Sequence, residues 1–198
     1  SALSLSVTPK LELSSASLTG DKHNKLVPAD ITETEAGLIA AVSANCEDTT
    51  AGYTGCHVYE IAVTASNATN DATLSAKLSL TPTTHEDQNW HYALLQKSTT
   101  GAYSTGALTL TTLKDDGASP TAKSIHSFDD GEEDLCTEDL SAGTTYYYLV
   151  VWLENIESSQ NGVTGDGSNV EDATGTYSGT ITLSASGGQV KASFSTGV

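Results

Sequence analysis

Residues 1–13 alternate between aliphatic and polar side chains. The aliphatic residues all occupy odd positions: Leu3, Leu5, Val7, Leu11 and Leu13. Successive side chains of a β-strand point to opposite faces, so this alternation predicts a strand with one continuous apolar face. Because Pro9 has no backbone N–H, we expect the strand at a sheet edge or a bulge. Such a face must be buried, either within its own domain or in another copy.

The segment that follows, residues 14–36, is rich in Ser, Thr, Asp, Lys and Glu and shows no clear period. Gly20 and Pro28 interrupt it further, so we predict a polar linker there. The chain is thereby divided into a strand at residues 1–13, the linker at 14–36 and a β-sandwich domain at 37–198. One domain is the expectation for a chain of this length.

A strand on a linker has two possible acceptors. It can fold back as the ordinary first strand of its own sandwich. It can also reach into a neighbouring copy by donor-strand complementation, in which main-chain hydrogen bonds extend the partner's sheet. The aliphatic side chains of residues 1–13, at about 1.5–3 kcal/mol each, provide on the order of 7–15 kcal/mol before the ordering cost of association is subtracted. The alternation is equally compatible with both alternatives.

The composition is strongly acidic. The formal net charge is −17, with 8 Lys plus Arg against 25 Asp plus Glu, so nucleic acids and anionic lipids are repelled at long range. The sequence contains no Met and begins at Ser1, which predicts a processed N-terminus after removal of a secretion signal. The nearest candidate for a membrane span, residues 146–153, is too short. We therefore expect a secreted protein, extracellular or at the cell surface, without membrane insertion.

The rest of the chain predicts short strands separated by polar turns, and no helix of useful length. The predicted strands cover residues 37–45, 57–64, 74–80, 90–96, 107–113, 121–128, 146–153, 177–183 and 190–194. Two pairs are predicted hairpins: 57–64 with 74–80, and 177–183 with 190–194. Residues 146–153 are apolar or aromatic on both parities, which is typical of a central strand covered on both faces. The predicted fold class is all-β, a jelly-roll or Greek-key β-sandwich with an extended N-terminal donor strand.

The sequence contains three cysteines. Cys46 and Cys56 flank a turn-rich stretch between two strand-like runs, so we predict a disulfide that closes this loop. Cys136 is then left as a buried free thiol, unless it is the true partner of one of the other two. No Cys-x-x-Cys pair occurs, which leaves a structural zinc site with little support.

No arrangement of residues demands catalysis. The five histidines are scattered, and the sequence lacks both the His-Glu-x-x-His motif of zinc proteases and the Gly-x-Ser-x-Gly motif of serine hydrolases. His57 and His91 fall within predicted strands, where a lone histidine is interpreted as a core or surface residue. We therefore predict no catalytic residue, no metal site and no cofactor.

Two further features are predicted for the surface. The acidic run at residues 129–134 is interpreted as a solvated loop, because the ordered ligand positions of a calcium-binding EF-hand are absent. Asn67 begins an Asn-Ala-Thr sequon in a predicted turn, which makes it the candidate for glycosylation.

Five segments together resemble the strand sequences of a known protein family. They are residues 58–64 (VYEIAVT), 74–80, 89–94 (NWHYAL), 143–154 (GTTYYYLVVWLE) and 177–182 (YSGTIT). In this combination the chain resembles the secreted, fibre-forming β-sandwich proteins of the TasA-like and archaeal bundling-pilin type, over most of its length after residue 37. The resemblance implies a jelly-roll subunit that polymerises when the N-terminal strand of one copy completes the sheet of the next. The opening residues, the cysteines and the loop at residues 154–175 depart from the family pattern.

Three functions are compatible with these features. The leading prediction is a non-enzymatic structural subunit of an extracellular filament, pilus-like or a biofilm-matrix fibre, whose partner is another copy of the same chain. The alternative is a monomeric cell-surface adhesion or carbohydrate-binding module with the first strand folded back in cis. Exposed aromatic residues would favour the module, and Tyr53, Trp90 and Tyr103 are the candidates. A hydrolase or metalloprotease ranks last, because no matching motif is present.

Overall fold

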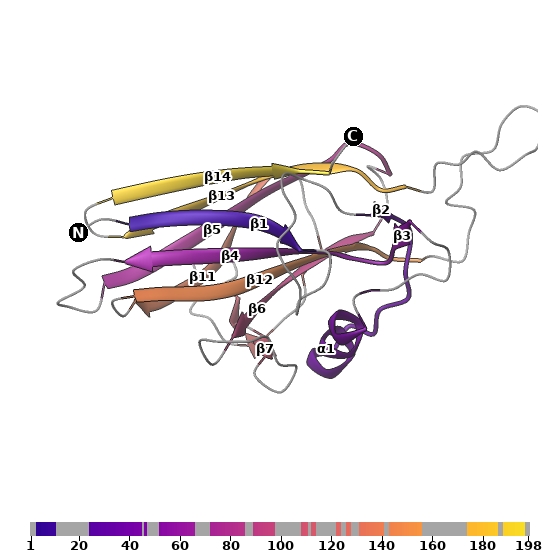
Figure 1. Ribbon diagram of the computed structural model, residues 1–198, viewed down its shortest axis with the longest axis horizontal. Helices are drawn as coiled ribbons and strands as arrows, with labels where there is room; N and C mark the ends of the chain where they lie inside the picture. The colour runs from indigo at the N-terminus through magenta and orange to yellow at the C-terminus, as the bar shows by residue number, and fades with distance from the viewer. Residues whose placement is uncertain are drawn as a thin grey trace, which may run out of the picture.

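The computed structural model describes residues 3–10, 24–44, 46, 52–65, 72–85, 89–97, 108–110, 112–113, 122–123, 126–127, 131–140, 143–155, 174–185 and 188–196. Over these residues the chain is mostly β-strand, arranged mainly in antiparallel sheets, with one short helix (Figure 1). The all-β prediction is therefore confirmed. Within the described part of the chain, no helix is both long and apolar enough to cross a membrane.

Two large sheets contain most of the strands. The six-stranded sheet has the order β1-β4-β12-β6-β10, with β7 also paired to β6. Its strands are β1 (Leu3–Lys10), β4 (His57–Ala65), β12 (Gly143–Leu153), β6 (Trp90–Lys97), β10 (His126–Ser127) and β7 (Leu108–Leu110). The four-stranded sheet consists, in order, of β11 (Gly131–Leu140), β5 (Ala72–Pro82), β13 (Tyr177–Ala185) and β14 (Gly188–Ser195). Two short pairs join β2 (Lys25–Leu26) to β3 (Tyr53–Thr54) and β8 (Thr112–Leu113) to β9 (Ala122–Lys123).

Aromatic side chains fill the space between the two large sheets, which form two layers in Figure 1. Tyr59 of β4 contacts Phe194 of β14, with ring centroids 4.6 Å apart, and Trp90 of β6 contacts Tyr177 of β13 at 5.7 Å. All four rings are buried. Gly179 lies opposite Phe194 and leaves room for its ring, because a Cβ at residue 179 would lie 2.5 Å from that ring. The layer between the sheets is therefore closely packed.

Strand β12 lies in the middle of the six-stranded sheet, between β4 and β6. Residues 147–153 are all buried, which confirms the prediction of a central strand covered on both faces. Leu149 lies opposite Tyr59 and so faces the four-stranded sheet. Val150 faces the other way and packs in a cluster with residues of helix α1 (Glu35–Ser43). The six-stranded sheet therefore has one face against the second sheet and the other against the helix.

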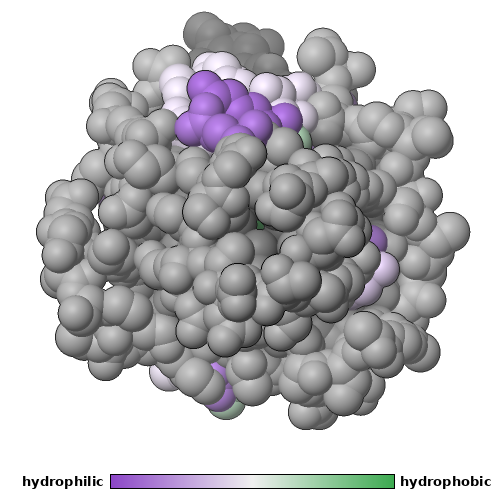
Figure 2. Space-filling view, turned by 90° about the vertical axis from the view of Figure 1, so that its left-hand side faces the viewer, coloured by the Kyte–Doolittle hydropathy of each residue, from purple (hydrophilic) through white to green (hydrophobic). Residues whose placement is uncertain are grey.

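The outer face of the four-stranded sheet is polar where β13 and β14 are described. Gln189, Lys191 and Ser193 of β14 and Ser178 of β13 are exposed. Figure 2 views the molecule from the left-hand side of Figure 1 and shows hydrophilic residues gathered at the top, where β14 lies. β13 and β14 therefore bury one face and present the other to solvent, as strands of antiparallel sheets commonly do.

Helix α1 replaces the strand predicted at residues 37–45, and the prediction that no helix of useful length forms is also wrong. Thr34 caps the helix, because its Oγ1 accepts a hydrogen bond from the Gly37 N–H at 3.0 Å. Two buried side chains one turn apart face the sheet, Leu38 and Val42. A short apolar run fits a strand or a helix equally well by its length and hydrophobicity, and the capping threonine is the local signal that favours the helix.

The predicted hairpin between residues 57–64 and 74–80 is wrong. β4 and β5 belong to different sheets, and β5 pairs with β11 and β13 instead. Alternation specifies that each strand has one buried face. It does not specify in which of the two sheets the strand finds its hydrogen-bonded partners, because both sheets face the same core. The second predicted hairpin is confirmed by the β13–β14 pairing, which reaches Ala185 opposite Gly188 at the turn.

The acidic run at residues 129–134 is not a loop over its described part, so that prediction is also wrong. Residues 131–134 belong to β11, an edge strand of the four-stranded sheet. The register shifts between Asp134 and Cys136, which marks a bulge. Charges and bulges are typical of edge strands, because they discourage pairing with the sheet of another molecule.

Replacing Gly37 with alanine should destabilise the protein, although alanine is the better helix former by about 1 kcal/mol. A Cβ at residue 37 would lie 2.4 Å from the carbonyl oxygen of Thr32 and 2.6 Å from its Cβ, so the helix start must shift, at about 1–3 kcal/mol. Urea unfolding measures the change. Ala40→Gly is the control, since Ala40 is exposed and its replacement loses only about 1 kcal/mol of helix propensity. A Gly37→Ala variant more stable than the parent protein would contradict this close approach.

Candidate functional site

Strand β1 forms one edge of the six-stranded sheet. It pairs with β4 in antiparallel orientation, from Leu3 opposite Ala65 to Lys10 opposite Val58. β1 also lies beside β14, the edge strand of the second sheet (Figure 1). β1 therefore covers the side of the molecule where the edges of both sheets meet.

The register decides which face of β1 turns inward. Val7 lies opposite Ile61 and Pro9 opposite Tyr59, and both partners are buried between the sheets. Because directly opposed residues of an antiparallel pair share a face, the odd positions of β1 belong to the inner face. The predicted donor-strand residues on that face are Leu3, Leu5 and Val7, while Leu11 and Leu13 lie outside the described residues.

Removal of β1 would turn β4 into the edge strand of its sheet. The main-chain N–H and C=O groups along that side of β4 would then be open to pairing. Main-chain pairing depends on the register of the two strands and not on which chain supplies them. In the single chain, β1 pairs with the chain's own β4.

The described part of the predicted linker packs against the sheets. Leu26 is buried, and the Ala29 N–H donates to the carbonyl oxygen of Leu153 at 2.9 Å. Residues 24–36 are thus part of the folded body, and residues 11–23 lie outside the described residues.

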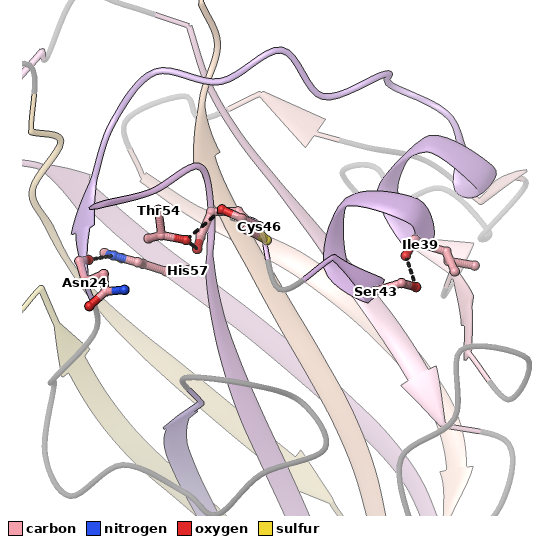
Figure 3. Close-up of a disulfide and its surroundings, with 7 residues drawn as sticks. Asn24, Ile39, Ser43, Cys46, Thr54 and His57 are labelled. Carbon is pink, nitrogen blue, oxygen red and sulfur yellow. Dashed lines mark hydrogen bonds between the residues drawn. A yellow bond between two sulfur atoms is a disulfide. The ribbon is translucent and has the colours of Figure 1, made fainter. Parts of the chain in front are cut away.

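Buried hydrogen bonds connect the same segment to both sheets. The His57 Nε2 contacts the carbonyl oxygen of Asn24 at 2.8 Å (Figure 3), and its Nδ1 contacts the Tyr177 hydroxyl at 2.8 Å. The Tyr177 hydroxyl in turn contacts that of Tyr59 at 2.7 Å. A carbonyl oxygen only accepts, so the Nε2 of His57 carries the proton of the first bond. His57 is therefore a core residue that joins the two sheets to the segment before α1.

Cys46 lies beyond the end of α1 (Figure 3) and is bonded to its predicted partner. Cys46 follows the helix and Cys56 precedes β4; a disulfide joins them, and their Cα atoms are 5.3 Å apart. The Thr54 hydroxyl lies 2.9 Å from the carbonyl oxygen of Cys46 and 3.1 Å from that of Cys56. The disulfide therefore ties the helix to the first residues of the sheet that it covers. Cys136 lies in β11, outside this pair.

A carboxylate–imidazole cluster, formed by Glu33, His91 and Glu154, lies at one end of the six-stranded sheet. The Nε2 of His91 is 2.9 Å from Oε1 of Glu33 and 2.9 Å from Oε2 of Glu154. One ligand atom from each residue lies within 4.8 Å of the other two. The side chain of His91 is 8% exposed, whereas those of Glu33 and Glu154 are 52% and 41% exposed. The cluster thus has a buried nitrogen at its base and two carboxylates toward solvent.

Three separate elements bring this cluster together. His91 lies near the start of β6, opposite Trp152 of β12, with ring centroids 5.5 Å apart. Glu154 directly follows β12, and its N–H donates to the carbonyl oxygen of Asn89 at 2.9 Å. Glu33 belongs to the segment before α1 that packs along the end of β12. Because 63 residues separate His91 from Glu154, no local motif marks the cluster, and the sequence alone indicates only a lone histidine.

The remaining sequence-predicted positions are not brought together. Trp90, a candidate exposed aromatic residue, is 1% exposed, so that prediction is wrong, and Tyr53 is half-buried. Tyr103 and the glycosylation candidate Asn67 lie outside the described residues. Within the ranges that the structure describes, the cluster of Glu33, His91 and Glu154 is the one group of three ligand-type side chains close enough to hold a metal ion.

Comparison with known proteins gives no assignment. No model of a known protein family matches the chain, and no curated protein matches its sequence. The function must therefore be inferred from the chain's own pattern and geometry.

Proposed function

We propose that the protein is a structural subunit of an extracellular filament, pilus-like or part of a biofilm matrix, in which β1 of one copy pairs with β4 of the next. The observation that carries the proposal is the place of β1, an edge strand whose apolar positions fall on the inner face. A contact between two different surfaces generates a helical polymer when the rotation between successive copies does not close into a ring, and the proposal takes this open case. The jelly-roll class and the resemblance to TasA-like and archaeal bundling-pilin fibre proteins belong to the same proposal.

The contact between copies repeats a contact that the single chain can make with itself. In the proposed contact, the apolar positions Leu3, Leu5 and Val7 supply roughly 5–9 kcal/mol, at about 1.5–3 kcal/mol for each side chain that the acceptor buries, and the main-chain ladder with β4 adds to it. The register with β4 is the same whether β1 pairs in cis or in trans. Assembly is thus an exchange of β1 between identical acceptor strands. The exchange changes the free energy little and is favoured by high protein concentration.

Two further features support a role outside the cell. Disulfides such as Cys46–Cys56 persist mainly in oxidising compartments. The net charge of −17 favours solubility of the subunit and opposes binding to nucleic acid. The proposed role needs no active site, and the partner is a second copy of the same chain.

The alternative function is a monomeric cell-surface adhesion or carbohydrate-binding module. The pairing of β1 with β4 within one chain favours it directly, because a module needs its first strand in cis. The two functions differ in one observable, which is the molecule that supplies the strand beside β4.

Disulfide trapping across the β1–β4 register separates the two functions. Ser6 lies opposite Ala62, and opposed residues of an antiparallel pair have Cα atoms about 4.5–5.5 Å apart, within the range of about 4.4–6.8 Å that a disulfide accepts. We would prepare Ser6→Cys/Ala62→Cys in a Cys136→Ser background, oxidise it under assembly conditions and separate the products on a denaturing, non-reducing gel.

A ladder of covalent oligomers is expected, because each β1 is then fixed to the next copy. A product that runs only as an internally closed monomer would instead establish the monomeric module. Ser6→Cys/Lys25→Cys in the same background is the control, since Lys25 is exposed and lies in β2, which is not paired with β1. This control should give neither product in comparable yield.

A further inference from the structure

We propose that Glu33, His91 and Glu154 bind one divalent transition-metal cation of the Zn²⁺ class. This inference is independent of filament formation, because none of the three residues lies in β1 or β4. It rests on the geometry of the cluster, the burial of its histidine and the chemistry of its three ligand atoms.

The spacing of the ligand atoms fits a small cation. Zinc bonds of about 2.0–2.2 Å to nitrogen and oxygen place tetrahedral ligands roughly 3.4 Å apart. Each carboxylate oxygen is 2.9 Å from the His91 Nε2, and all three ligand atoms lie within 4.8 Å of one another. Shifts of the two glutamate side chains would bring the three ligand atoms to this spacing around one cation. Both glutamate side chains are half-exposed and have room for such a shift.

The histidine is positioned in advance. Its side chain is 8% exposed, and its ring packs against Trp152 at a centroid distance of 5.5 Å. Packing thus points Nε2 toward the two carboxylates before any ion arrives. Main-chain bonds hold the flanking segments, because the Ala29 N–H donates to the Leu153 carbonyl oxygen and the Glu154 N–H to that of Asn89, both at 2.9 Å. A rigid nitrogen with two adjustable oxygens is a suitable arrangement for metal binding.

The electrostatics of the cluster favour a cation. One ring nitrogen faces two carboxylate oxygens at the same distance, yet an N–H donates a single proton. A divalent cation would interact favourably with both carboxylates and with the lone pair of Nε2 at once. The net charge of −17 also raises the local concentration of cations around the protein.

The ligand types select the class of metal. An imidazole nitrogen is a poor ligand for Ca²⁺ and Mg²⁺, which prefer oxygen, and a good one for zinc and its neighbours. Three protein ligands leave a fourth position for water or for a group from another molecule. Binding would fasten the segment before α1 to β6 and to the end of β12, so the ion is expected to stabilise the fold.

The test is a zinc titration of the full chain after removal of metal with a chelator. Isothermal titration calorimetry should show binding of one ion per chain, and thermal unfolding should show a rise in Tm with added ZnCl₂. Glu33→Gln and Glu154→Gln, both at half-exposed positions that should not disturb folding, should each weaken binding at least about tenfold. His91→Gln should do the same and should also abolish the visible absorption bands of the Co²⁺-substituted protein.

His85→Gln is the matched control. His85 is half-buried and contributes its main-chain oxygen to the Trp90 indole N–H at 3.0 Å, so its side chain is replaceable and the affinity for Zn²⁺ should stay the same. Absence of stoichiometric binding by the parent protein would overturn the site. Equal affinity in Glu33→Gln, Glu154→Gln and the parent protein would also overturn it, because the zinc would then lie elsewhere. Neither result depends on whether filaments form.

Discussion

Deletion of residues 1–13 should abolish filament formation. The truncated chain lacks β1, so the edge of β4 is open and no copy can supply a strand to its neighbour. It also loses the apolar positions Leu3, Leu5 and Val7, for which the alternation predicts a contribution of roughly 5–9 kcal/mol, a large fraction of the 5–15 kcal/mol typical of a folded domain. Electron microscopy of purified material should show filaments for the full chain and dispersed particles for the truncated one.

A synthetic peptide of residues 1–13 should rescue the stability of the truncated chain without restoring filaments. The peptide fills the β4 edge, so Tm should rise with peptide concentration. A peptide with Leu5→Ser and Val7→Ser is the control, because it keeps the main chain but loses apolar groups of the inner face. Ordered fibres formed by the truncated chain alone would rule out β1 as the connecting strand.

Removal of the disulfide should destabilise the protein by about 3 kcal/mol, the value that loop-closure entropy predicts for a loop of this size. The bond closes a sequence separation of 10 residues. It also ties helix α1 to the start of β4, so the cluster of Leu38, Val42 and the outer face of the sheet should open first. Urea unfolding of Cys46→Ser/Cys56→Ser against the parent protein measures the difference.

The controls for this prediction separate the disulfide from the other thiol. Cys136→Ser should leave the reductant dependence unchanged, because Cys136 is not part of the pair. The parent protein with excess reductant should unfold at the same urea concentration as the double variant. A midpoint that is insensitive to reductant would mean that the bond does not contribute to stability.

The strands were the most predictable part of the fold. Period-two alternation located β4, β5, β13 and β14, and it identified the inner face through residues such as Tyr59 and Ile61. The unbroken apolar run of β12 identified the strand with both faces covered. These predictions succeed because side-chain direction along a strand depends only on sequence parity.

Like β11, helix α1 was an element that the pattern failed to identify. Its apolar run is about as long as a strand, and hydrophobicity alone does not separate the two. Thr34 and the alanines of the helix were the local signals in its favour. Packing against the outer face of the six-stranded sheet stabilises the helical conformation, and that face exists only after the sheet has formed.

The sequence by itself determined which residues form most of the strands, which of their faces are buried, and that Cys46 and Cys56 are close enough along the chain to pair. Only the tertiary structure decided that β4 and β5 enter different sheets, that β11 carries the acidic run at an edge, and that Glu33, His91 and Glu154 meet. The physical reason is the range of the interactions. Strand parity and capping act between neighbours along the chain, whereas sheet partners and the ligand cluster depend on contacts between segments that only folding brings together.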